Sequence, residues 1–342
     1  MKTSPFVAQP MPLQTVMVKV ITALVPGVLL AVWAFGIGVL VQIALAIVVA
    51  LATEAACLKL RNYPLKPFLT DGSAVVTACL LALSIPPLAP WWLIVLGTFI
   101  AIGFAKHLYG GLGQNPFNPA MVGFAVLIVS FPAQMSRWAA PRALAQPDLG
   151  ALAQVVYIFT GHLSQAFDAV ASATPLDTIR TGLLQHGALR DILKAPLFHV
   201  GGGPAQQWIS LGFLVGGLYL WRHKVINWRL PLAFIAGLGL TATVFWLADS
   251  AHYMSPLFHL VTGGAMLGAF FIITDPVTAP TTPLGQFIFA GLSGMLAYLI
   301  RVLGNYPDGV AFAVLILNIA GPFIDQYTQP AVFGRKKKGA KA

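Results

Sequence analysis

Residues 119–131 read PAMVGFAVLIVSF, and residues 307–319 read PDGVAFAVLILNI. Seven of these thirteen positions are identical at an offset of 188 residues. A second pair of segments, DGSA at 71–74 and TGGA at 262–265, aligns at an offset of 191 residues. Similarity at a long and nearly constant spacing predicts an internal structural repeat. The alternative is chance similarity between apolar segments.

The rest of the chain is as apolar as these segments. Of its 342 residues, 58% are hydrophobic and 9% are charged, whereas a soluble domain carries roughly 25% charged residues. Apolar runs recur from Val18 to Ile324. They are continuous rather than alternating, which favours helices over a β-barrel. We therefore predict an all-α integral membrane protein with about ten transmembrane helices. These cover 18–35, 37–58, 72–86, 91–107, 119–131, 206–221, 231–247, 256–274, 286–301 and 309–324.

The repeat offset covers five predicted helices, an odd number, so the two copies must cross the membrane in opposite directions. We expect two inverted five-helix repeats with a site between them near mid-membrane. Pro86-Pro87 and the segment NPFNP at 115–119 shorten two helices, and such broken half-helices are typical of buried transporter-like sites. The predicted domains are 1–131 (first repeat), 132–205 (long loop), 206–324 (second repeat) and 325–342 (basic tail).

The basic residues predict the orientation, because they concentrate in cytoplasmic loops. With both termini in the cytoplasm, 14 of the 20 basic residues lie inside. Five of the others lie in the segment 132–205, and long segments translocate regardless of charge. Arg301 alone is then expected in a short outer loop. The inside set comprises Lys2, Lys19, Lys59, Arg61, Lys66, Lys106, Arg222, Lys224, Arg229 and five residues between Arg335 and Lys341.

Composition also excludes several functions. The net charge of +10 lies mainly in the tail and in short loops, which indicates contact with anionic lipid rather than with nucleic acid. Cys57 and Cys79 both lie in apolar runs and form no CxxC motif, so this chain alone cannot build an iron–sulfur or zinc site. The seven histidines are scattered without ligand spacing on one helix, so we expect neither haem nor a metal site.

The long segment 132–205 contains an unusual run of small residues, DAVASATPLDT at 168–178. Loops of more than about 15 residues are usually functional or disordered. Read from the residues alone, this run is a turn followed by a helix start. Either Thr174 or Asp177 could cap that helix, and Pro175 suits its first turn.

Several motifs resemble the NqrB/RnfD family, which contains membrane components of Rnf electron-transport complexes and of the sodium-pumping NADH:quinone reductase. The resemblance covers most of the chain. It is to the Rnf member, because the long N-terminal extension typical of the sodium-pump relative is lacking. The matching segments are 71–74 (DGSA), 86–92 (PPLAPWW), 109–123 (YGGLGQNPFNPAMVG), 263–271 (GGAMLGAFF), 274–278 (TDPVT) and 306–313 (YPDGVAFA).

This resemblance implies a covalently bound flavin. In the family, a loop of the form Asp-x-x-Ser/Thr-Gly/Ser-Ala-Thr carries FMN on its threonine, through a phosphoester made by a separate flavin transferase. Asp168, Ser172, Ala173 and Thr174 match that form, and Ala171 departs from it. Thr174 is thus the expected attachment point, an FMN phosphoryl threonine. A helix starting just after Thr174 would favour the phosphate charge.

The resemblance also implies a second flavin, riboflavin, held without a covalent bond in the membrane part. Asn115 and Asn118 stand three residues apart beside a helix break, so on a helical turn they would share a face. The two amides could then meet the edge of the flavin ring. The alternative is that both asparagines simply satisfy the backbone at the break, and the sequence leaves these two interpretations open.

Ionisable residues within a membrane are functional candidates, and four acids qualify: Glu54, Asp71, Asp275 and Asp308. Asp71 and Asp275 lie at predicted helix ends, where capping is the simpler interpretation. An ion pathway through these residues is the other. The sequence does not choose Na⁺ or H⁺ as the coupling ion.

Two functions of different classes follow. The resemblance implies a flavin-bearing redox subunit in the bacterial inner membrane, with residues 132–205 in the periplasm. It would relay electrons between other Rnf subunits, from the NADH or ferredoxin side, coupled to Na⁺ or H⁺ translocation. It would carry no catalytic residue of its own. The repeat and half-helices taken alone favour a small-solute channel or transporter, and a purely structural scaffold is a third interpretation.

Overall fold

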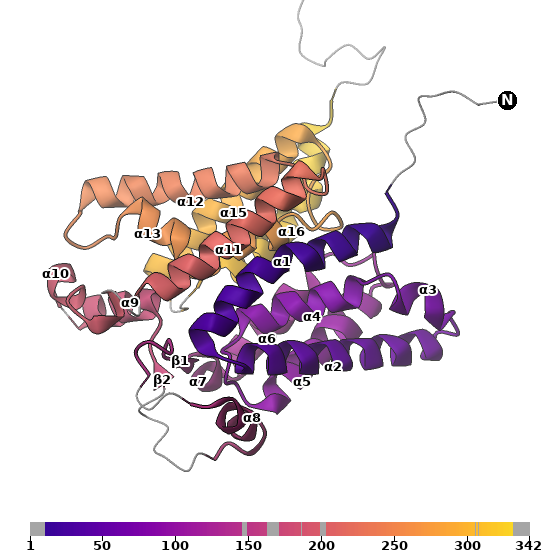
Figure 1. The fold of residues 1–342 in the computed structure, drawn as a ribbon. Coiled ribbons are helices and arrows are strands. Elements are labelled where there is room, and N and C mark those ends of the chain that lie inside the picture. The colour runs from indigo at the N-terminus through magenta and orange to yellow at the C-terminus, as the bar shows by residue number, and fades with distance from the viewer. Residues whose placement is uncertain are drawn as a thin grey trace, which may run out of the picture.

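The computed structural model describes residues 11–145, 149–162, 171–185, 187–198, 203–304, 306 and 308–330, and it is built almost wholly from helices (Figure 1). Within these residues, six helical stretches are long and apolar enough to cross a membrane. Together with several shorter apolar helices they define an all-α, multi-pass membrane protein. The six stretches are Leu13–Phe35, Gly38–Leu60, Leu65–Ser84, Arg229–Ala248, Pro283–Leu303 and Val310–Thr328.

The N-terminal half contains long helices interrupted by prolines. A Pro-Pro pair follows α4, and Pro119 occupies the first turn of α6, where its missing N–H costs nothing. The helix after Pro90 changes to π geometry at Ile100. The elements are α1 (Leu13–Phe35), α2 (Gly38–Leu60), α3 (Leu65–Leu69), α4 (Ser73–Ser84), α5 (Trp91–Phe99), the π-helix η1 (Ile100–His107) and α6 (Pro119–Ser130).

The C-terminal half has the same alternation of long and broken helices. Serine and threonine caps open two of its helices, since Ser255 and Thr282 accept hydrogen bonds from the first-turn N–H groups of α13 and α15. The elements are α11 (Gly203–Arg222), α12 (Arg229–Ala248), α13 (Pro256–Val261), α14 (Ala265–Leu267), the π-helix η4 (Gly268–Ile272), α15 (Pro283–Leu303) and α16 (Val310–Thr328).

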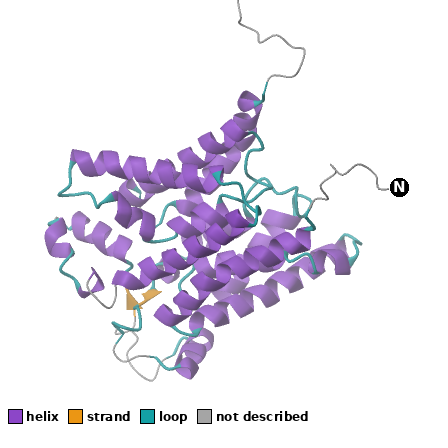
Figure 2. Cartoon of the chain, turned by 45° about the horizontal axis from the view of Figure 1, so that its top comes forward, coloured by secondary structure: helices purple, strands orange, loops and turns teal. Residues whose placement is uncertain are grey.

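The segment between the halves forms small elements at one end of the molecule (Figure 2). Two short strands pair there in antiparallel fashion, Trp138 opposite Ser172 and Ala139 opposite Ala171. The elements are α7 (Pro132–Met135), β1 (Trp138–Ala139), α8 (Ala151–Thr160), β2 (Ala171–Ser172), α9 (Pro175–Leu184), α10 (Leu189–Ile192) and the 3₁₀ turn η3 (Pro196–Phe198).

The helices lie close to the ranges expected from the apolar runs, with one exception. The sequence predicted a single helix over 256–274, and this is wrong, because the helix breaks between Val261 and Ala265. Gly263 adopts the left-handed conformation with φ +69°, which ends a helix. Gly72 adopts the same conformation before α4 with φ +83°. The two segments aligned as a repeat therefore share a left-handed glycine.

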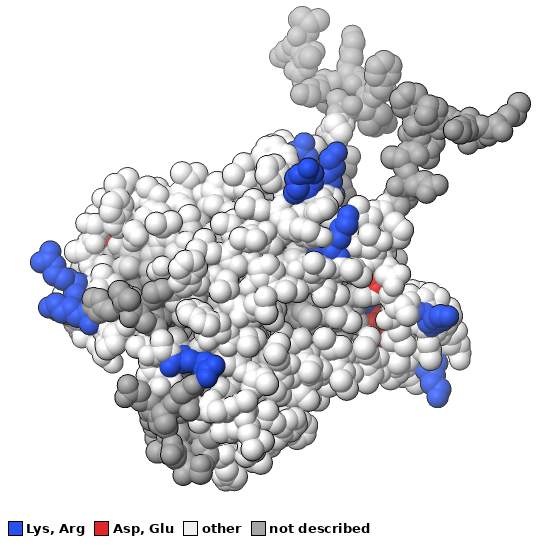
Figure 3. Space-filling view, in the orientation of Figure 1, with Lys and Arg blue, Asp and Glu red and all other residues white. Residues whose placement is uncertain are grey.

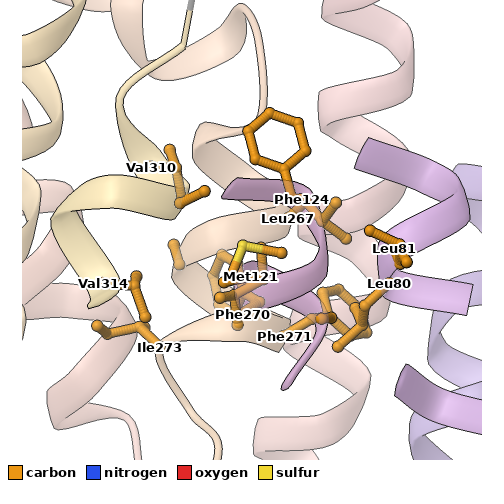
Figure 4. Packing of buried hydrophobic residues seen from close by; sticks show 14 of the residues in the cluster. Leu80, Leu81, Met121, Phe124, Leu267, Phe270, Phe271, Ile273, Val310 and Val314 are labelled. Atoms are coloured by element: carbon orange, nitrogen blue, oxygen red, sulfur yellow. The ribbon is translucent and has the colours of Figure 1, made fainter. Parts of the chain in front are cut away.

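The two halves pack tightly against each other through small residues and a common apolar core. A Cβ atom on Gly216 of α11 would lie 1.8 Å from the carbonyl oxygen of Ala23 in α1, so only glycine permits this approach. Figure 4 shows Leu80, Met121, Phe124 and their neighbours meeting the C-terminal half in one buried cluster. The residues that they meet in that half are Leu267, Phe270, Phe271, Ile273, Val310 and Val314.

Charged side chains gather at the two ends of the molecule, and a broad surface without Lys or Arg lies between them (Figure 3). We call one end the basic end, defined by the exposed residues Lys59, Arg61, Lys66, Arg222 and Lys224. We call the other the loop end, defined by the described residues 132–145, 149–162, 171–185 and 187–198. The uncharged band suits a hydrocarbon environment.

Two cations near helix ends are buried in the structure. Arg301, expected in a short outer loop, lies in the last turn of α15. That expectation was wrong because the apolar run before Arg301 was read as the end of a helix. Lys106, which the sequence placed within the predicted helix 91–107, lies in η1. Both side chains turn inward to carboxylates.

Candidate functional site

Thr174 is the N-cap of α9. Its hydroxyl oxygen accepts a hydrogen bond of 3.2 Å from the backbone N–H of Asp177, and its carbonyl accepts one of 3.0 Å from the Thr178 hydroxyl. Pro175 occupies the first helical position. The prediction that a helix begins just after this residue is confirmed, and the cap is Thr174 rather than Asp177. The Thr174 side chain is half-buried, so its hydroxyl is held in place at a helix N-terminus.

Thr174 also lines a cavity of about 150 Å³, which we call the loop-end cavity. Its walls come from both halves of the chain, and they are mostly apolar. Leu176, two residues after Thr174, lies against the turn that precedes α14, because a Cβ on Gly263 would meet Leu176 Cδ1 at 2.7 Å. Apolar lining residues include Phe35, Leu83, Met121, Phe124, Ile209, Phe213, Leu267 and Val310.

The polar groups that line this cavity differ in whether they have hydrogen-bond partners. Asp308 lines it, but its carboxylate is fully engaged by four donors: Arg301 Nε (3.0 Å) and Nη2 (3.3 Å), and the N–H groups of Gly264 (2.6 Å) and Val310 (3.2 Å). By contrast, Gln206 Oε1 is buried and has no hydrogen-bond partner within the described part of the chain. An unpaired buried oxygen in a cavity wall suits a ligand that brings an N–H donor.

Ser172 and Ala173 of the predicted attachment motif directly precede Thr174. Ser172 is in β2, opposite Trp138, and its hydroxyl donates to the Ala173 carbonyl at 3.2 Å. Ala173 is exposed. Asp168 lies outside the described residues. Small and accessible residues thus precede a hydroxyl that a modifying enzyme would have to reach.

Asn115 and Asn118 line a second cavity of about 110 Å³, which we call the basic-end cavity. Asn118 is structural: its side-chain oxygen caps α6 through Met121 N (3.2 Å), and its backbone N–H donates to Asn318 Oδ1 (3.1 Å). Asn115 donates to the Phe117 carbonyl at 3.0 Å. Its Oδ1 is buried without a partner among the residues that the structure describes. The two asparagines therefore share a cavity but have different roles in the fold.

A buried charged cluster adjoins this cavity. Lys106 Nζ donates to Glu54 Oε1 at 2.5 Å and to Ser73 Oγ at 2.8 Å. Ser73 donates in turn to Asp71 Oδ1, through its hydroxyl at 2.6 Å and its backbone N–H at 2.7 Å. His107 Nε2 lies 3.4 Å from Glu54 Oε1. The expectation that Asp71 caps a helix end is confirmed, and the cluster extends that cap deep into the fold.

The fourth acid of the sequence set, Asp275, follows η4 and also lines the basic-end cavity. Its carboxylate accepts from the Val277 N–H at 3.0 Å and from the Thr278 hydroxyl at 3.4 Å, which is again a capping arrangement. Among the described residues, no group of three or more His, Cys, Asp or Glu side chains is placed to hold a metal ion.

Sequence reasoning found Thr174 and both asparagines but missed Gln206 and Lys106. Gln206 stands at the start of a helix, where a glutamine carries no special signal. Glu54, however, is the one glutamate of the chain. A lone buried acid calls for a cationic partner, and that requirement could have directed attention to the lysine of the IAIGFAKH run at 100–107.

The described residues form a multi-pass helical membrane protein with a cavity beside a helix-capping threonine and another beside a buried ion pair. Residues 1–334 match the NQR2, RnfD, RnfE family, and the chain belongs to this family.

Curated relatives align along almost the whole chain. The D subunit of the ion-translocating oxidoreductase complex of Yersinia pseudotuberculosis is 50% identical over 344 residues, covering 98% of both chains. The protein of the same name from Escherichia fergusonii is 48% identical, again with 98% of both chains covered. That of Aeromonas hydrophila is 49% identical, covering 98% of this chain and 99% of the relative. The resemblance noted in the sequence is therefore confirmed at the level of the family.

Proposed function

We propose that this chain is the flavin-bearing membrane subunit of an Rnf-type ion-translocating oxidoreductase complex, and that it carries FMN on Thr174. The observation that carries the proposal is the position of the Thr174 hydroxyl, at a helix N-terminus and in the wall of an apolar cavity between the two halves of the chain. The relatives at about 50% identity are named as the D subunit of an ion-translocating oxidoreductase complex.

The residues present fit an FMN group. The N–H groups at the start of α9 favour a phosphate on the Thr174 oxygen, because a helix N-terminus attracts negative charge. The apolar walls of the loop-end cavity suit a planar aromatic ring, and Gln206 Oε1 offers an acceptor for a ring N–H. The Asp308 carboxylate adds little negative charge to the loop-end cavity, because Arg301 neutralises it.

A bound flavin would supply one- and two-electron transfer. The contribution of the chain is then to position it. Thr174 anchors the phosphate, the capped start of α9 fixes the direction of the anchor, and Phe124 and Leu267 exclude water from the cavity. The Gly263–Gly264 turn, held by Asp308, keeps the opposite wall in place.

The basic-end cavity is the proposed place of the second flavin, riboflavin. Asn115 supports this, because its buried Oδ1 lacks a partner in the described residues and lines the cavity. Asn118 supports it less, because its side chain is committed to the cap of α6. Of the two interpretations left open by the sequence, ligand contact therefore suits Asn115, and backbone support suits Asn118.

The proposed architecture is two inverted five-helix repeats, 1–131 and 206–324, in a bacterial inner membrane. The loop 132–205 would be periplasmic, with both termini and the tail 325–342 cytoplasmic. The exposed cations of the basic end support that orientation. The partners would be the other subunits of the complex and a flavin transferase acting on the loop. Electrons from the NADH or ferredoxin side would be coupled to Na⁺ or H⁺.

A small-solute transporter is the second candidate. The specific observation in its favour is a cavity toward each end of the molecule, next to helices broken at Gly72 and Gly263. A transporter needs no modified threonine, so covalent flavin separates the two functions.

The test is flavin fluorescence after denaturing electrophoresis of membranes that contain the chain and an active flavin transferase. We expect a fluorescent wild-type band and none for Thr174→Val. Thr178→Val is the matched control, since Thr178 lies one turn further along the same helix and bonds to Thr174. A dark wild-type band, with the transferase active on another substrate, would overturn the proposal in favour of the transporter.

A further inference from the structure

The turn between α2 and α3, at the basic end, exposes apolar and cationic side chains next to each other. The proposed flavin chemistry uses none of them. Three of these side chains are cations, and six are apolar or aromatic. We call this surface the α2–α3 patch, which comprises Lys59, Leu60, Arg61, Tyr63, Leu65, Lys66, Phe68, Leu108 and Tyr109.

The apolar part of the patch lies where two apolar helices end. Leu60 is the last residue of α2 and is 84% exposed, and Leu108 directly follows η1 and is 71% exposed. Tyr63 and Tyr109 are also exposed. Tyrosine concentrates at the level of the lipid headgroups, where its ring meets hydrocarbon and its hydroxyl meets water. This part of the patch therefore suits the boundary between the hydrocarbon and the headgroups.

The arginine of the patch is held in one orientation. Arg61 Nη1 donates a hydrogen bond of 2.9 Å to the Gly110 carbonyl, and its guanidinium carbon lies 4.7 Å from the centroid of the Tyr63 ring. That ring in turn lies 6.1 Å from the Phe68 ring. A guanidinium has five N–H donors in a planar fork that matches a phosphate. Fixing this fork lowers the entropy lost when a phosphate binds.

The backbone of the turn brings a further cation back toward α2. Asn62 adopts a left-handed φ of +56°, and the Tyr63 N–H donates to the Leu58 carbonyl at 2.9 Å. This turn ends α2 and reverses the chain, so that α3, which carries Lys66, packs against α2. The cations of the patch are therefore grouped by the fold as well as by the sequence.

The positive charge of the patch is not balanced by acids on the surface. Glu54 and Asp71 are the described acids nearest to the patch in sequence, and they are 1% and 9% exposed. Both are engaged inside the fold, Glu54 by Lys106 and Asp71 by Ser73. An exposed group of cations without acids attracts an anion from outside the chain.

The combination of charge and apolar surface selects the kind of anion. A free phosphate would satisfy the cations but leave the leucines of the patch in water. An acidic protein would also satisfy the cations, but Leu60 and Leu108 end membrane helices, where acyl chains are already present. An anionic glycerophospholipid supplies both chemistries, because a phosphate and acyl chains belong to one molecule.

We infer that the α2–α3 patch is a binding site for one anionic glycerophospholipid. Its phosphate lies on the Arg61 guanidinium, with Lys59 and Lys66 beside it, and its acyl chains pack on Leu60 and Leu108. Binding is non-covalent. The site goes beyond the proposed function and does not depend on it, since a transporter with this surface would bind the same lipid.

The test is native mass spectrometry of the full chain released from nanodiscs that contain equal amounts of phosphatidylcholine and phosphatidylglycerol. The wild type should retain one phosphatidylglycerol in preference to phosphatidylcholine. Lys59→Gln/Lys66→Gln should lower that retention about 25-fold, since each cation near the surface contributes about five-fold. Arg222→Gln/Lys224→Gln is the matched control, because it removes the same charge from exposed positions at the same end, and it should retain the lipid.

Four outcomes would overturn the inference. The first is no preference for phosphatidylglycerol in the wild type, and the second is an equal loss in both double variants, which would mean diffuse attraction to the basic end. Displacement of the lipid by inorganic phosphate would mean a simple anion site. Loss of the lipid in the complete complex, with retention by the chain alone, would mean that a partner protein covers the patch.

A further variant tests the orientation of the guanidinium. Arg61→Lys keeps the charge but loses the planar fork stacked on Tyr63, so it should weaken retention of phosphatidylglycerol although the net charge is unchanged. Retention equal to the wild type would refute the placement of the phosphate on Arg61. Thermal unfolding of each variant, expected to match the wild type because the substituted side chains are exposed, shows that a loss of lipid is not a loss of fold.

Discussion

The turns before α4 and before α14 have the same backbone but different carboxylates. Gly72 and Gly263 both adopt left-handed φ angles, +83° and +69°. In the first turn, the carboxylate comes from the preceding residue, Asp71, which accepts from Ser73 N at 2.7 Å. In the second turn, the carboxylate is that of Asp308, 44 residues further along the chain, which accepts from Gly264 N at 2.6 Å.

This difference sets the electrostatics of the two cavities. Arg301 neutralises Asp308, so the loop-end cavity is apolar and suits an aromatic ring. Among the described residues, Asp71 has no ion pair of its own. It is linked through Ser73 to Lys106, which pairs with Glu54, so two carboxylates share one buried cation beside the basic-end cavity. The same backbone turn therefore borders two cavities with different electrostatic environments, and the position of the charged residues in the chain determines the difference.

The largest expected effect comes from removing the cations. Lys106→Met leaves Glu54 buried without its partner and should lower the free energy of unfolding by about 3–5 kcal/mol. Arg301→Met should cost less, about 2 kcal/mol, because the Asp308 side chain is 24% exposed and keeps two backbone donors. Thermal unfolding in detergent measures both, with the exposed Lys59→Met as control. The reverse order would contradict the charge assignment.

The next effect concerns the two glycines. Gly263→Ala should cost about 2–3 kcal/mol, because it combines a strained φ with a Cβ at 2.7 Å from both Asp308 Oδ2 and Leu176 Cδ1. Gly72→Ala should cost about 1 kcal/mol, since its Cβ meets only Met17, at 3.0 Å. Gly150, with φ −57° and open space around it, is the control. Equal losses at 72 and 263 would refute this difference.

Much of the fold could be predicted because membrane helices follow from long apolar runs. The break at 262–264 was missed although the repeat aligned it with 71–73, where a helix start had been placed at residue 72. Apolar residues flank 262–264 on both sides, so hydrophobicity does not reveal the break there, and the glycine conformation does. The predicted helix start at residue 72 aligns with residue 263. Placing a helix start there as well would have located the break.

The candidate site was less predictable, because its parts meet through tertiary packing. Thr174 was recognisable from its motif, but its cavity is built from residues as distant as Phe35 and Val310. Lys106 was placed within the predicted helix 91–107, but its buried ion pair was not predicted. Its partner Glu54 lies 52 residues away, a separation at which no local pattern predicts contact.

A smaller effect separates the two asparagines at the basic-end cavity. Asn118→Ala removes the cap of α6 and should cost about 1 kcal/mol in unfolding free energy. Asn115→Ala should leave stability nearly unchanged, since its side chain makes one hydrogen bond, to Phe117, but it should weaken retention of non-covalent flavin in the purified complex. Thermal unfolding and flavin extraction measure the two effects. Loss of flavin with Asn118→Ala alone would reverse the assignment.

The smallest effect is expected at the loop-end cavity. If Gln206 Oε1 faces a flavin, its partial negative charge disfavours added electrons, and Gln206→Leu should raise the two-electron midpoint potential by about 20 mV, the equivalent of one hydrogen bond of roughly 1 kcal/mol. The fluorescent band at Thr174 should persist, because Gln206 is no part of the anchor. Redox titration of the purified complex measures the potential, with the exposed neighbour Gln207→Leu as control. An unchanged potential with the band retained would mean that the flavin ring lies away from Gln206, and the loop-end cavity would lose its one specific polar contact to that ring.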